Sequence, residues 1–299
     1  MIKRIIDISS PAYLYLKHKQ LLIDQKGETM AQVAIEDLGV LILQHPAIVV
    51  TQALIVCCQK NNVAMVFCDE RHLPYSVLLP ISDANSLHTK IIQQQIDCSC
   101  ITKKRIWQQI VKHKISGQAE VLKYFGKNAI SLDRLVKQVK SGDIENAEAQ
   151  AAQKYWRLLF GNSFRRDTDL AGINSLLNYG YAIIRAMVAR AIVASGLHPA
   201  LGVQHHNQYN GLCLADDLME PFRPWVDWLV YKLNEQEDIS DVNQSNKQLM
   251  LNLLSDTVVF NQQKMPLMVA CHYVLGDIKR AFEDKSVKIH YPKLLAMSQ

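Results

Sequence analysis

The segment at residues 169–202, "DLAGINSLLNYGYAIIRAMVARAIVASGLHPALG", constrains the fold more than any other part of the chain. Its apolar residues fall on most sides of a helix, and Gly196 is the expected end of that helix. Such a helix needs other elements to cover it, so we expect it at the centre of a helical domain. The chain has 299 residues, 49% of them hydrophobic, which is enough for a large core. No run approaches the ~18 consecutive apolar residues that a membrane span needs, so no membrane association is expected.

The rest of the chain divides into two regions of different periodicity. Residues 1–85 contain short segments rich in branched and aromatic residues, such as "RIIDIS" and "VAMVFCDE", which predict strands with one short helix. From about Leu87 onward, apolar residues recur three and four positions apart, which is helical spacing. The predicted fold class is therefore α+β, with a small β-rich N-terminal domain over residues 1–85 and a large all-α C-terminal domain over residues 86–299.

Several segments carry more specific expectations. Side chains of residues 13–23 partly alternate, as in a half-buried antiparallel strand. The segment "TQALIVCCQKNN" at residues 51–62 fits a short buried helix as well as a strand. The alanine-rich residues 146–160 predict a helix that ends at Gly161. Further helices are expected around residues 223–233, 247–260 and 266–283.

Missing motifs count against several function classes, namely nucleotide-driven motors, dinucleotide enzymes, zinc peptidases and serine hydrolases. The chain has no phosphate-binding P-loop, no G-x-G-x-x-G after a strand, no H-E-x-x-H and no G-x-S-x-G. An odd number of cysteines, seven, favours reduced thiols, and the N-terminus lacks the features of a signal peptide, so we expect a cytoplasmic protein. The formal net charge of +5 is compatible with a polyanionic partner but does not by itself identify one.

The segment "LADDLMEPFRP" concentrates negative charge within this basic chain, at Asp216, Asp217 and Glu220. One interpretation is a capping box, because acidic residues three positions apart stabilise the start of a helix. The other is a metal site, because residues three apart share a helix face and Mg²⁺ or Mn²⁺ prefers carboxylate oxygens. A nitrogen ligand is available upstream, at His205 or His206 in "GVQHH". Spacing alone leaves both interpretations open.

Other charged residues are ambiguous in the same way. Glu148 is either an ordinary acidic residue in the first turn of a helix or a third metal ligand. Basic clusters are suited to gripping phosphate, although each is also typical of a solvated helix face. These clusters are Lys103–Lys104–Arg105, Arg165–Arg166 and Lys279–Arg280.

Three blocks taken together resemble the CRISPR-associated spacer-acquisition integrases. They are "AEAQAAQKYWRLLFG", "INSLLNYGYAIIRAMVARAIVASGLHPALGVQH" and "LADDLMEPFRPWVD", in this order and spacing. "VAMVFCDERHLPYSVLLP" resembles the end of the β-rich domain of that family. The resemblance covers most of the chain, except the last fifty residues, and is nearest to the forms found in type II systems.

The resemblance implies a metal-dependent DNA endonuclease and integrase that uses Mg²⁺ or Mn²⁺. Its ligands would be Glu148, His205 and Glu220, with Asp217 as an auxiliary ligand or a residue that supports the ligands. The resemblance assigns no role to His206. The implied reaction is attack by the 3′ hydroxyl of a short foreign DNA fragment on a phosphodiester at a CRISPR repeat boundary. The implied partners are double-stranded DNA, a second copy of the chain in a homodimer, and a small second adaptation protein in a heterohexamer.

Two alternatives to the integrase make different predictions. A non-catalytic DNA-binding scaffold, in which the acidic block only caps a helix, would bind DNA and give no product with any divalent ion. A hydrolase of small phosphoesters would turn over a generic phosphodiester without polymeric DNA.

Overall fold

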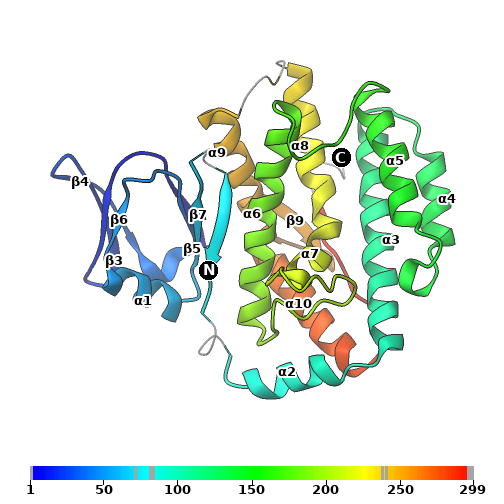
Figure 1. Cartoon of the computed structure of the whole chain (residues 1–299), viewed down its shortest axis with the longest axis horizontal. Coiled ribbons are helices and arrows are strands. Elements are labelled where there is room, and N and C mark those ends of the chain that lie inside the picture. Colours follow the sequence, from blue (N-terminus) through cyan, green and yellow to red (C-terminus); the bar gives the residue numbers. More distant parts are fainter. Residues whose placement is uncertain (1–2, 71–72, 81–84, 237–238, 240–241, 295–299) are drawn as a thin grey trace.

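The computed structural model describes residues 3–70, 73–80, 85–236, 239 and 242–294. A strand-rich N-terminal region lies beside a larger helical region, as Figure 1 shows. The predicted α+β class is confirmed.

The N-terminal region contains two four-stranded sheets. The outer sheet has the order β4-β3-β2-β6, and the inner sheet has the order β1-β5-β7-β8. In the inner sheet β1, β5 and β7 are parallel and β8 is antiparallel. The strands are β1 (Arg4–Ile8), β2 (Tyr13–Lys17), β3 (Gln20–Gln25), β4 (Glu28–Ala34), β5 (Leu38–Leu43), β6 (Val49–Val50), β7 (Ala64–Cys68) and β8 (Pro74–Leu78), with a 3₁₀ turn η1 (Ile35–Asp37) and helix α1 (Gln52–Lys60) between them.

The strand predicted over residues 13–23 is a hairpin of β2 and β3. His18 and Lys19 form its turn, both with positive φ, at 49° and 60°. That conformation suits the right-handed twist of a two-residue hairpin, and it is usually signalled by Asn or Gly, which this turn lacks. The ambiguous segment at residues 51–62 forms the helix α1.

Strand β5 joins the two regions of the molecule. All six of its residues are buried, as expected for a central parallel strand covered on both faces. Leu41 and Leu43 pack into a small core with the outer sheet and α1, whereas Val40 and Ile42 belong to the core of the helical region. Side chains on the two faces of β5 therefore pack into two different cores.

The helical region is built around α6 (Ile173–Ala194), which contacts α7, α8, α9 and α10 as well as β7 and β8. The predicted central helix is confirmed, and Gly196, with φ of 81°, follows its last turn as expected. Among the described residues α6 is the one helix long and apolar enough to cross a membrane. However, 83% of its apolar window is buried inside the molecule, as expected for a core helix.

The other helices, of which α3 is the longest, make up the rest of this region (Figure 1). They are α2 (His88–Asp97), α3 (Cys100–Tyr124), α4 (Ile130–Gln138), α5 (Ala147–Phe160), α7 (Cys213–Met219), α8 (Arg223–Gln236), α9 (Gln244–Asn252) and α10 (Leu267–Glu283), with 3₁₀ turns η2 (Ser141–Asp143), η3 (Glu220–Phe222) and η4 (Leu253–Ser255).

The region predicted to be all-α also contains three strands, so this part of the prediction is wrong. A three-stranded antiparallel sheet of β10 (Gln263–Pro266), β9 (Thr257–Phe260) and β11 (Lys293–Leu294) packs near α10. The helix expected over residues 247–260 therefore ends early, and its last four residues form β9.

The close approach of α6 and α8 depends on Gly180. A Cβ atom there would lie 2.4 Å from Cγ1 of Val226. We expect Gly180→Ala to destabilise the protein by about 1–3 kcal/mol, the usual cost of overpacking a core. Gly276 in α10 provides a matched control, because a Cβ there meets nothing within 4 Å, and Gly276→Ala should stabilise the helix by about 0.5–1 kcal/mol. Chemical denaturation measures both, and equal effects would contradict this packing.

Candidate active site

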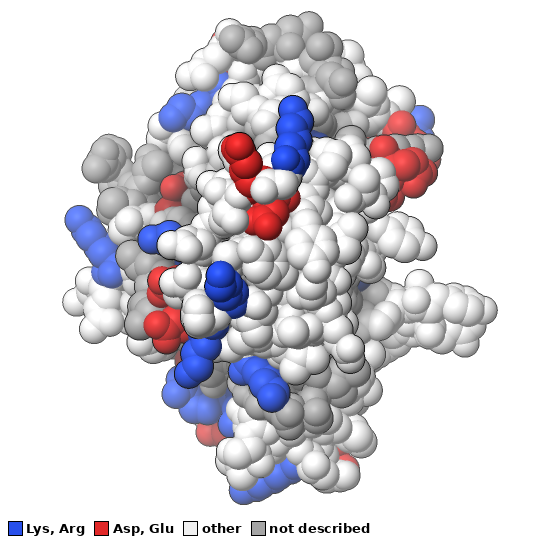
Figure 2. All heavy atoms as spheres, turned by 90° about the vertical axis from the view of Figure 1, so that its left-hand side faces the viewer, with Lys and Arg blue, Asp and Glu red and all other residues white. Residues whose placement is uncertain are grey.

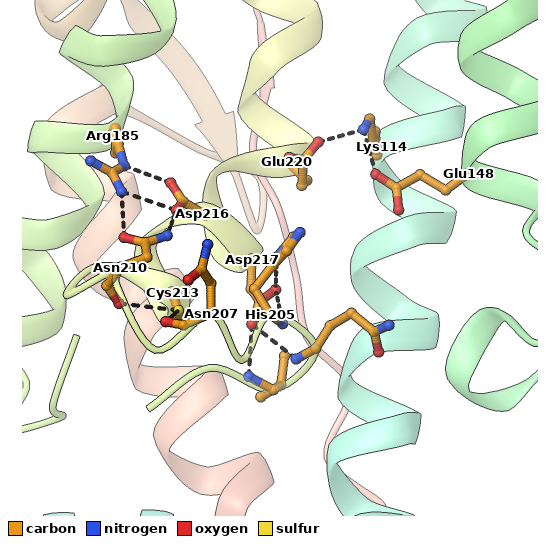
Figure 3. A network of polar contacts seen from close by, with 12 residues as sticks. Lys114, Glu148, Arg185, His205, Asn207, Asn210, Cys213, Asp216, Asp217 and Glu220 are labelled. Atoms are coloured by element: carbon orange, nitrogen blue, oxygen red, sulfur yellow. Dashed lines mark hydrogen bonds and ion pairs between the residues drawn. The ribbon is translucent and has the colours of Figure 1, made fainter. Parts of the chain in front are cut away.

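The three acidic residues of residues 214–224 face three different partners. They lie on one continuous stretch, since α7 runs into η3 and then into α8. Asp216 faces α6, Asp217 faces the loop before α7, and Glu220 faces α3, as Figure 3 shows. Asp217 and Glu220 therefore do not converge on one point, although they are three residues apart.

Asp217 holds the loop that carries His205. Its carboxylate is fully buried and accepts hydrogen bonds from the backbone N–H groups of Val203 (2.7 Å), Gln204 (3.0 Å) and His205 (3.2 Å). The capping-box interpretation is wrong, because Asp217 lies inside α7, whose N-cap is Leu212.

Gly202 allows the loop to wrap closely around this carboxylate. A Cβ atom at residue 202 would lie 2.3 Å from the carbonyl oxygen of His205 and 2.9 Å from Oδ2 of Asp217. A side chain at this position would push the loop away, so the spacing between Gly202 and His205 has a steric reason.

Within the described part of the chain, only one nitrogen of the His205 ring, Nδ1, has a hydrogen-bond partner. Nδ1 lies 2.5 Å from Oδ1 of Asp217 and donates to it. The hydrogen bond to Asp217 raises the pKa of His205 above its usual value, although burial opposes this shift. The rings of Trp107 and His205 form a T-shaped pair with centroids 5.9 Å apart. Since Nδ1 carries the proton, Nε2 has the lone pair that a metal ion needs. The neighbouring His206 is exposed.

Glu148 lies in the first turn of α5, the alanine-rich helix predicted over residues 146–160. Asp143, which was not predicted, caps this helix by accepting hydrogen bonds from the N–H groups of Ala147 (2.9 Å) and Glu148 (3.0 Å). The Glu148 side chain reaches α3.

Lys114 of α3 brings two of the predicted ligands together. Its Nζ atom lies 2.6 Å from Oε1 of Glu148 and 2.5 Å from Oε2 of Glu220. The second oxygen of Glu220 lies 2.9 Å from Nε of Arg223. Burial opposes ionisation of Glu220 most strongly, but the charges of Lys114 and Arg223 outweigh it and lower its pKa.

Lys114 and Arg223 were not singled out from the sequence. Helical periodicity could have identified Lys114 as a residue on the buried face of α3. It lies four residues from Ile110 and four from Gln118, which are both buried. A lysine at such a position needs a buried anionic partner.

Asp216 has a structural role next to this site. It pairs with Arg185 of α6 at 2.5 Å and accepts a hydrogen bond from Asn210 at 2.6 Å. Burial opposes ionisation of Asp216, yet the hydrogen bonds from Arg185 and Asn210 keep its pKa low. These contacts hold the loop between α6 and α7 against the helices.

The donor atoms fit a hard divalent cation. Glu148 and Glu220 supply oxygens and His205 supplies one nitrogen, the combination suited to Mg²⁺ or Mn²⁺. Oε2 of Glu220 is buried and receives no hydrogen bond of normal geometry, although it is close to Lys114. Within the described part of the chain, no three His, Cys, Asp or Glu side chains are already assembled at metal-ligand spacing. The two glutamates meet at Lys114, and His205 is paired with Asp217.

A cavity of about 110 Å³ lies next to the two cations that contact the glutamates, Lys114 and Arg223. Lys114, Arg166 and Arg223 line it, together with Tyr181 and Asp227. Burial raises the pKa of Asp227 to about 7, even though Tyr181 donates a hydrogen bond to it.

The pKa of Asp227 predicts a pH-dependent stability. Between its usual value of 3.8 and about 7, the folded protein keeps a proton that the unfolded chain has lost. The stability of the wild type therefore falls as the pH rises through this window. Asp227→Asn has no proton to lose, so we expect its melting temperature to rise relative to the wild type between about pH 4 and pH 7. Calorimetry measures this difference, and a difference independent of pH would contradict the assignment.

The sequence matches a known family over most of its length. Residues 7–260 match the family described as CRISPR associated protein Cas1. The chain is 34% identical over 296 residues to the CRISPR-associated endonuclease Cas1 of Neisseria meningitidis serogroup C (strain 8013), covering 98% of this chain and 96% of that protein. It is 26% identical over 231 residues to the CRISPR-associated endonuclease Cas1 2 of Saccharolobus solfataricus, covering 74% of this chain and 72% of that protein.

Solved structures share the fold. A CAS1 protein from Thermotoga maritima superposes with a TM-score of 0.80 at 16% identity, covering 96% of this chain and 100% of that chain. A casposase bound to an integration product superposes with a TM-score of 0.79 at 20% identity, covering 97% of this chain and 92% of that chain. The chain therefore belongs to the Cas1 family of CRISPR-associated proteins.

Proposed function

We propose that this chain is a metal-dependent DNA endonuclease and integrase that inserts short foreign DNA fragments into a CRISPR array. One observation carries the proposal. Glu148 of α5 and Glu220 of η3, far apart in the sequence, contact the same Lys114 nitrogen. The relatives described as CRISPR-associated endonucleases, and the casposase bound to an integration product, support the same chemistry.

Glu148, Glu220 and His205 would hold Mg²⁺ or Mn²⁺. When bound, the ion supplies charge that polarises a phosphodiester and favours deprotonation of an attacking hydroxyl. Asp217 keeps the lone pair of His205 on Nε2, and its four hydrogen bonds favour this positioning role over direct ligation. Arg223 offsets the negative charge that would otherwise repel a DNA phosphate.

The proposed reaction is a transesterification. The 3′ oxygen of a DNA fragment forms a new bond to phosphorus at the repeat boundary, and the bond from that phosphorus to the 3′ oxygen of the repeat strand breaks. The attacking hydroxyl loses a proton and the departing oxygen gains one. Because one phosphodiester replaces another, no nucleotide cofactor is required. A second attack on the other strand completes insertion.

Double-stranded DNA is the proposed substrate, and a basic groove supports it. The groove has a volume of about 430 Å³ and is lined by Arg105, Lys285 and Lys288 with the hydroxyls of Ser141 and Ser286. Lysine, arginine and serine side chains are common phosphate contacts. Two other arginines from the predicted clusters are engaged within the protein, since Arg166 donates to Asn174 and Asn178, and Arg280 pairs with Asp277.

We further propose a homodimer formed through the β-rich domain, residues 1–85, with residues 86–299 as the catalytic domain. Figure 2 views the molecule from the N-terminal side and shows a broad area with few charged side chains. Tyr13, Met30 and Val49 on the outer sheet are exposed apolar residues, with exposed fractions of 47–62%. An exposed apolar sheet face is typical of a protein interface.

The proposed assembly also contains the small second adaptation protein, with two dimers of this chain flanking a dimer of that protein. Structural neighbours include a Cas6-RT-Cas1–Cas2 complex, with a TM-score of 0.76 and 14% identity. We place this assembly in the cytoplasm, where its DNA substrates are.

Alanine substitutions at the site test the enzymatic proposal. We expect Glu220→Ala or His205→Ala to reduce strand transfer into a repeat-bearing plasmid by at least about 100-fold with Mn²⁺, the usual scale for losing a group that acts in the transition state. Binding of duplex DNA, followed by fluorescence anisotropy, should change little because phosphate contacts come from lysines and arginines elsewhere. His206→Ala, a change of the neighbouring exposed histidine, is the matched control and should retain activity.

EDTA distinguishes the proposed enzyme from a non-catalytic scaffold. Chelation should abolish strand transfer by the wild type and leave much of its DNA binding. Undiminished strand transfer by Glu220→Ala would contradict the metal site. Turnover of a small phosphodiester without DNA would instead favour the phosphoester hydrolase.

A further inference from the structure

Both carboxylate oxygens of Glu220 face a cation that belongs to the protein. Oε2 lies 2.5 Å from Nζ of Lys114, and Oε1 lies 2.9 Å from Nε of Arg223. The side chain of Glu220 is only 7% exposed and that of Lys114 only 12%. Water therefore does little to screen the attraction between these charges.

A divalent ion that bridges the two glutamates would compete with the Lys114 ammonium for the same space. Mg²⁺ binds carboxylate oxygens at about 2.0–2.1 Å, and the ammonium already lies 2.5 Å from Oε2 of Glu220 and 2.6 Å from Oε1 of Glu148. The ammonium already lies between the two carboxylates, and a second cation bridging the same oxygens would be repelled by it. We therefore expect an ion that bridges both glutamates at this place to displace Lys114.

A place for the displaced ammonium lies one helical turn away. Gln118 follows Lys114 by four residues on α3 and lines the same 110 Å³ cavity. Its Oε1 atom is buried and has no hydrogen-bond partner among the described residues, which is a costly state for a buried acceptor. A rotated Lys114 side chain would satisfy this oxygen.

The same rotation would create an anion site. Lys114, Arg166 and Arg223 all line the cavity. When Lys114 turns toward Gln118 and the metal ion neutralises Glu220, the charge of the Lys114 ammonium is no longer offset by the glutamates and the cavity has excess positive charge. A DNA phosphate is the anion available to an enzyme of the proposed function.

We propose that Lys114 occupies the place of the metal ion in the free protein and moves toward Gln118 and a DNA phosphate when the ion binds. Lys114 thereby makes the binding of the ion and of DNA cooperative: each favours the same position of the ammonium. This inference rests on the proposed function, because it takes Glu148 and Glu220 as the ligands.

Two substitutions with opposite expected effects test the displacement. Electron paramagnetic resonance of free Mn²⁺ measures ion binding by the protein alone. Lys114→Met removes the competing cation, so we expect Mn²⁺ to bind at least about tenfold more tightly, a modest effect for removing a buried like charge. Gln118→Leu removes the acceptor for the displaced ammonium and leaves every charge in place, so Mn²⁺ should bind more weakly.

Lys123→Met is the matched control for the loss of a lysine. Lys123 is on the same helix and pairs with Asp133, but both side chains are exposed. Its substitution should leave Mn²⁺ affinity unchanged. If Lys114→Met does not fold without metal, Gln118→Leu still tests the proposal with the same readout.

Saturating duplex DNA tests the cooperativity. DNA should strengthen Mn²⁺ binding to the wild type more than to Lys114→Met, with Glu220→Gln giving the background of ions bound by DNA itself. Equal Mn²⁺ affinity in the wild type, Lys114→Met and Gln118→Leu, together with its loss in Glu220→Gln, would overturn the displacement and leave the proposed metal site standing. Binding of Mn²⁺ that persists unchanged in Glu220→Gln would overturn the metal site itself.

Discussion

A buried carboxylate next to a half-buried one needs a cation between them, and this requirement governs the centre of the molecule. Glu148 and Glu220 have Lys114 in that place, with Arg223 against the outer oxygen of Glu220. Without positive charge, the cost of desolvating the carboxylates and their mutual repulsion would force one of them to take up a proton. The lowered pKa of Glu220 shows that the cations prevail over burial. A site of this kind attracts metal ions because its anionic oxygens are already held in position.

The helices around this centre keep each donor in place by a separate contact. Asp143 caps α5 and so positions Glu148, and Asp217 binds the loop of His205 from the far side. Asp216 ties the same loop to α6 through Arg185. Asp143, Asp216 and Asp217 thus have structural roles, and Glu148 and Glu220 remain available to bind a metal ion. The acidic composition of residues 214–224 therefore reflects both the construction of the loop and the proposed chemistry.

Sequence patterns predicted the features that depend on local chemistry. The central helix α6, its end at Gly196 and the stop of α5 at Gly161 follow from apolar spacing and from glycines with positive φ. The family was also predictable, because three motif blocks in order are far more specific than any one of them. The site residues remain predictions from that resemblance.

Features that depend on distant contacts were not predictable. Asp217 satisfies the spacing of a capping box. However, the three N–H groups that donate hydrogen bonds to it belong to a loop twelve or more residues upstream. Lys114 meets its partners only after α3, α5 and η3 have packed together. The strand β9 has no helix-breaking residue before it, and its partner strands β10 and β11 lie on either side of α10 in the sequence.

The most direct test of the proposed site is a crystal structure of the protein grown or soaked with Mn²⁺, using anomalous scattering to locate the ion. The expected result is an anomalous peak bonded to a carboxylate oxygen of Glu148, a carboxylate oxygen of Glu220 and Nε2 of His205, with Asp217 still bound to the other ring nitrogen. A peak on Asp216 or Asp217, with Glu148 and Glu220 still joined by Lys114, would contradict the account.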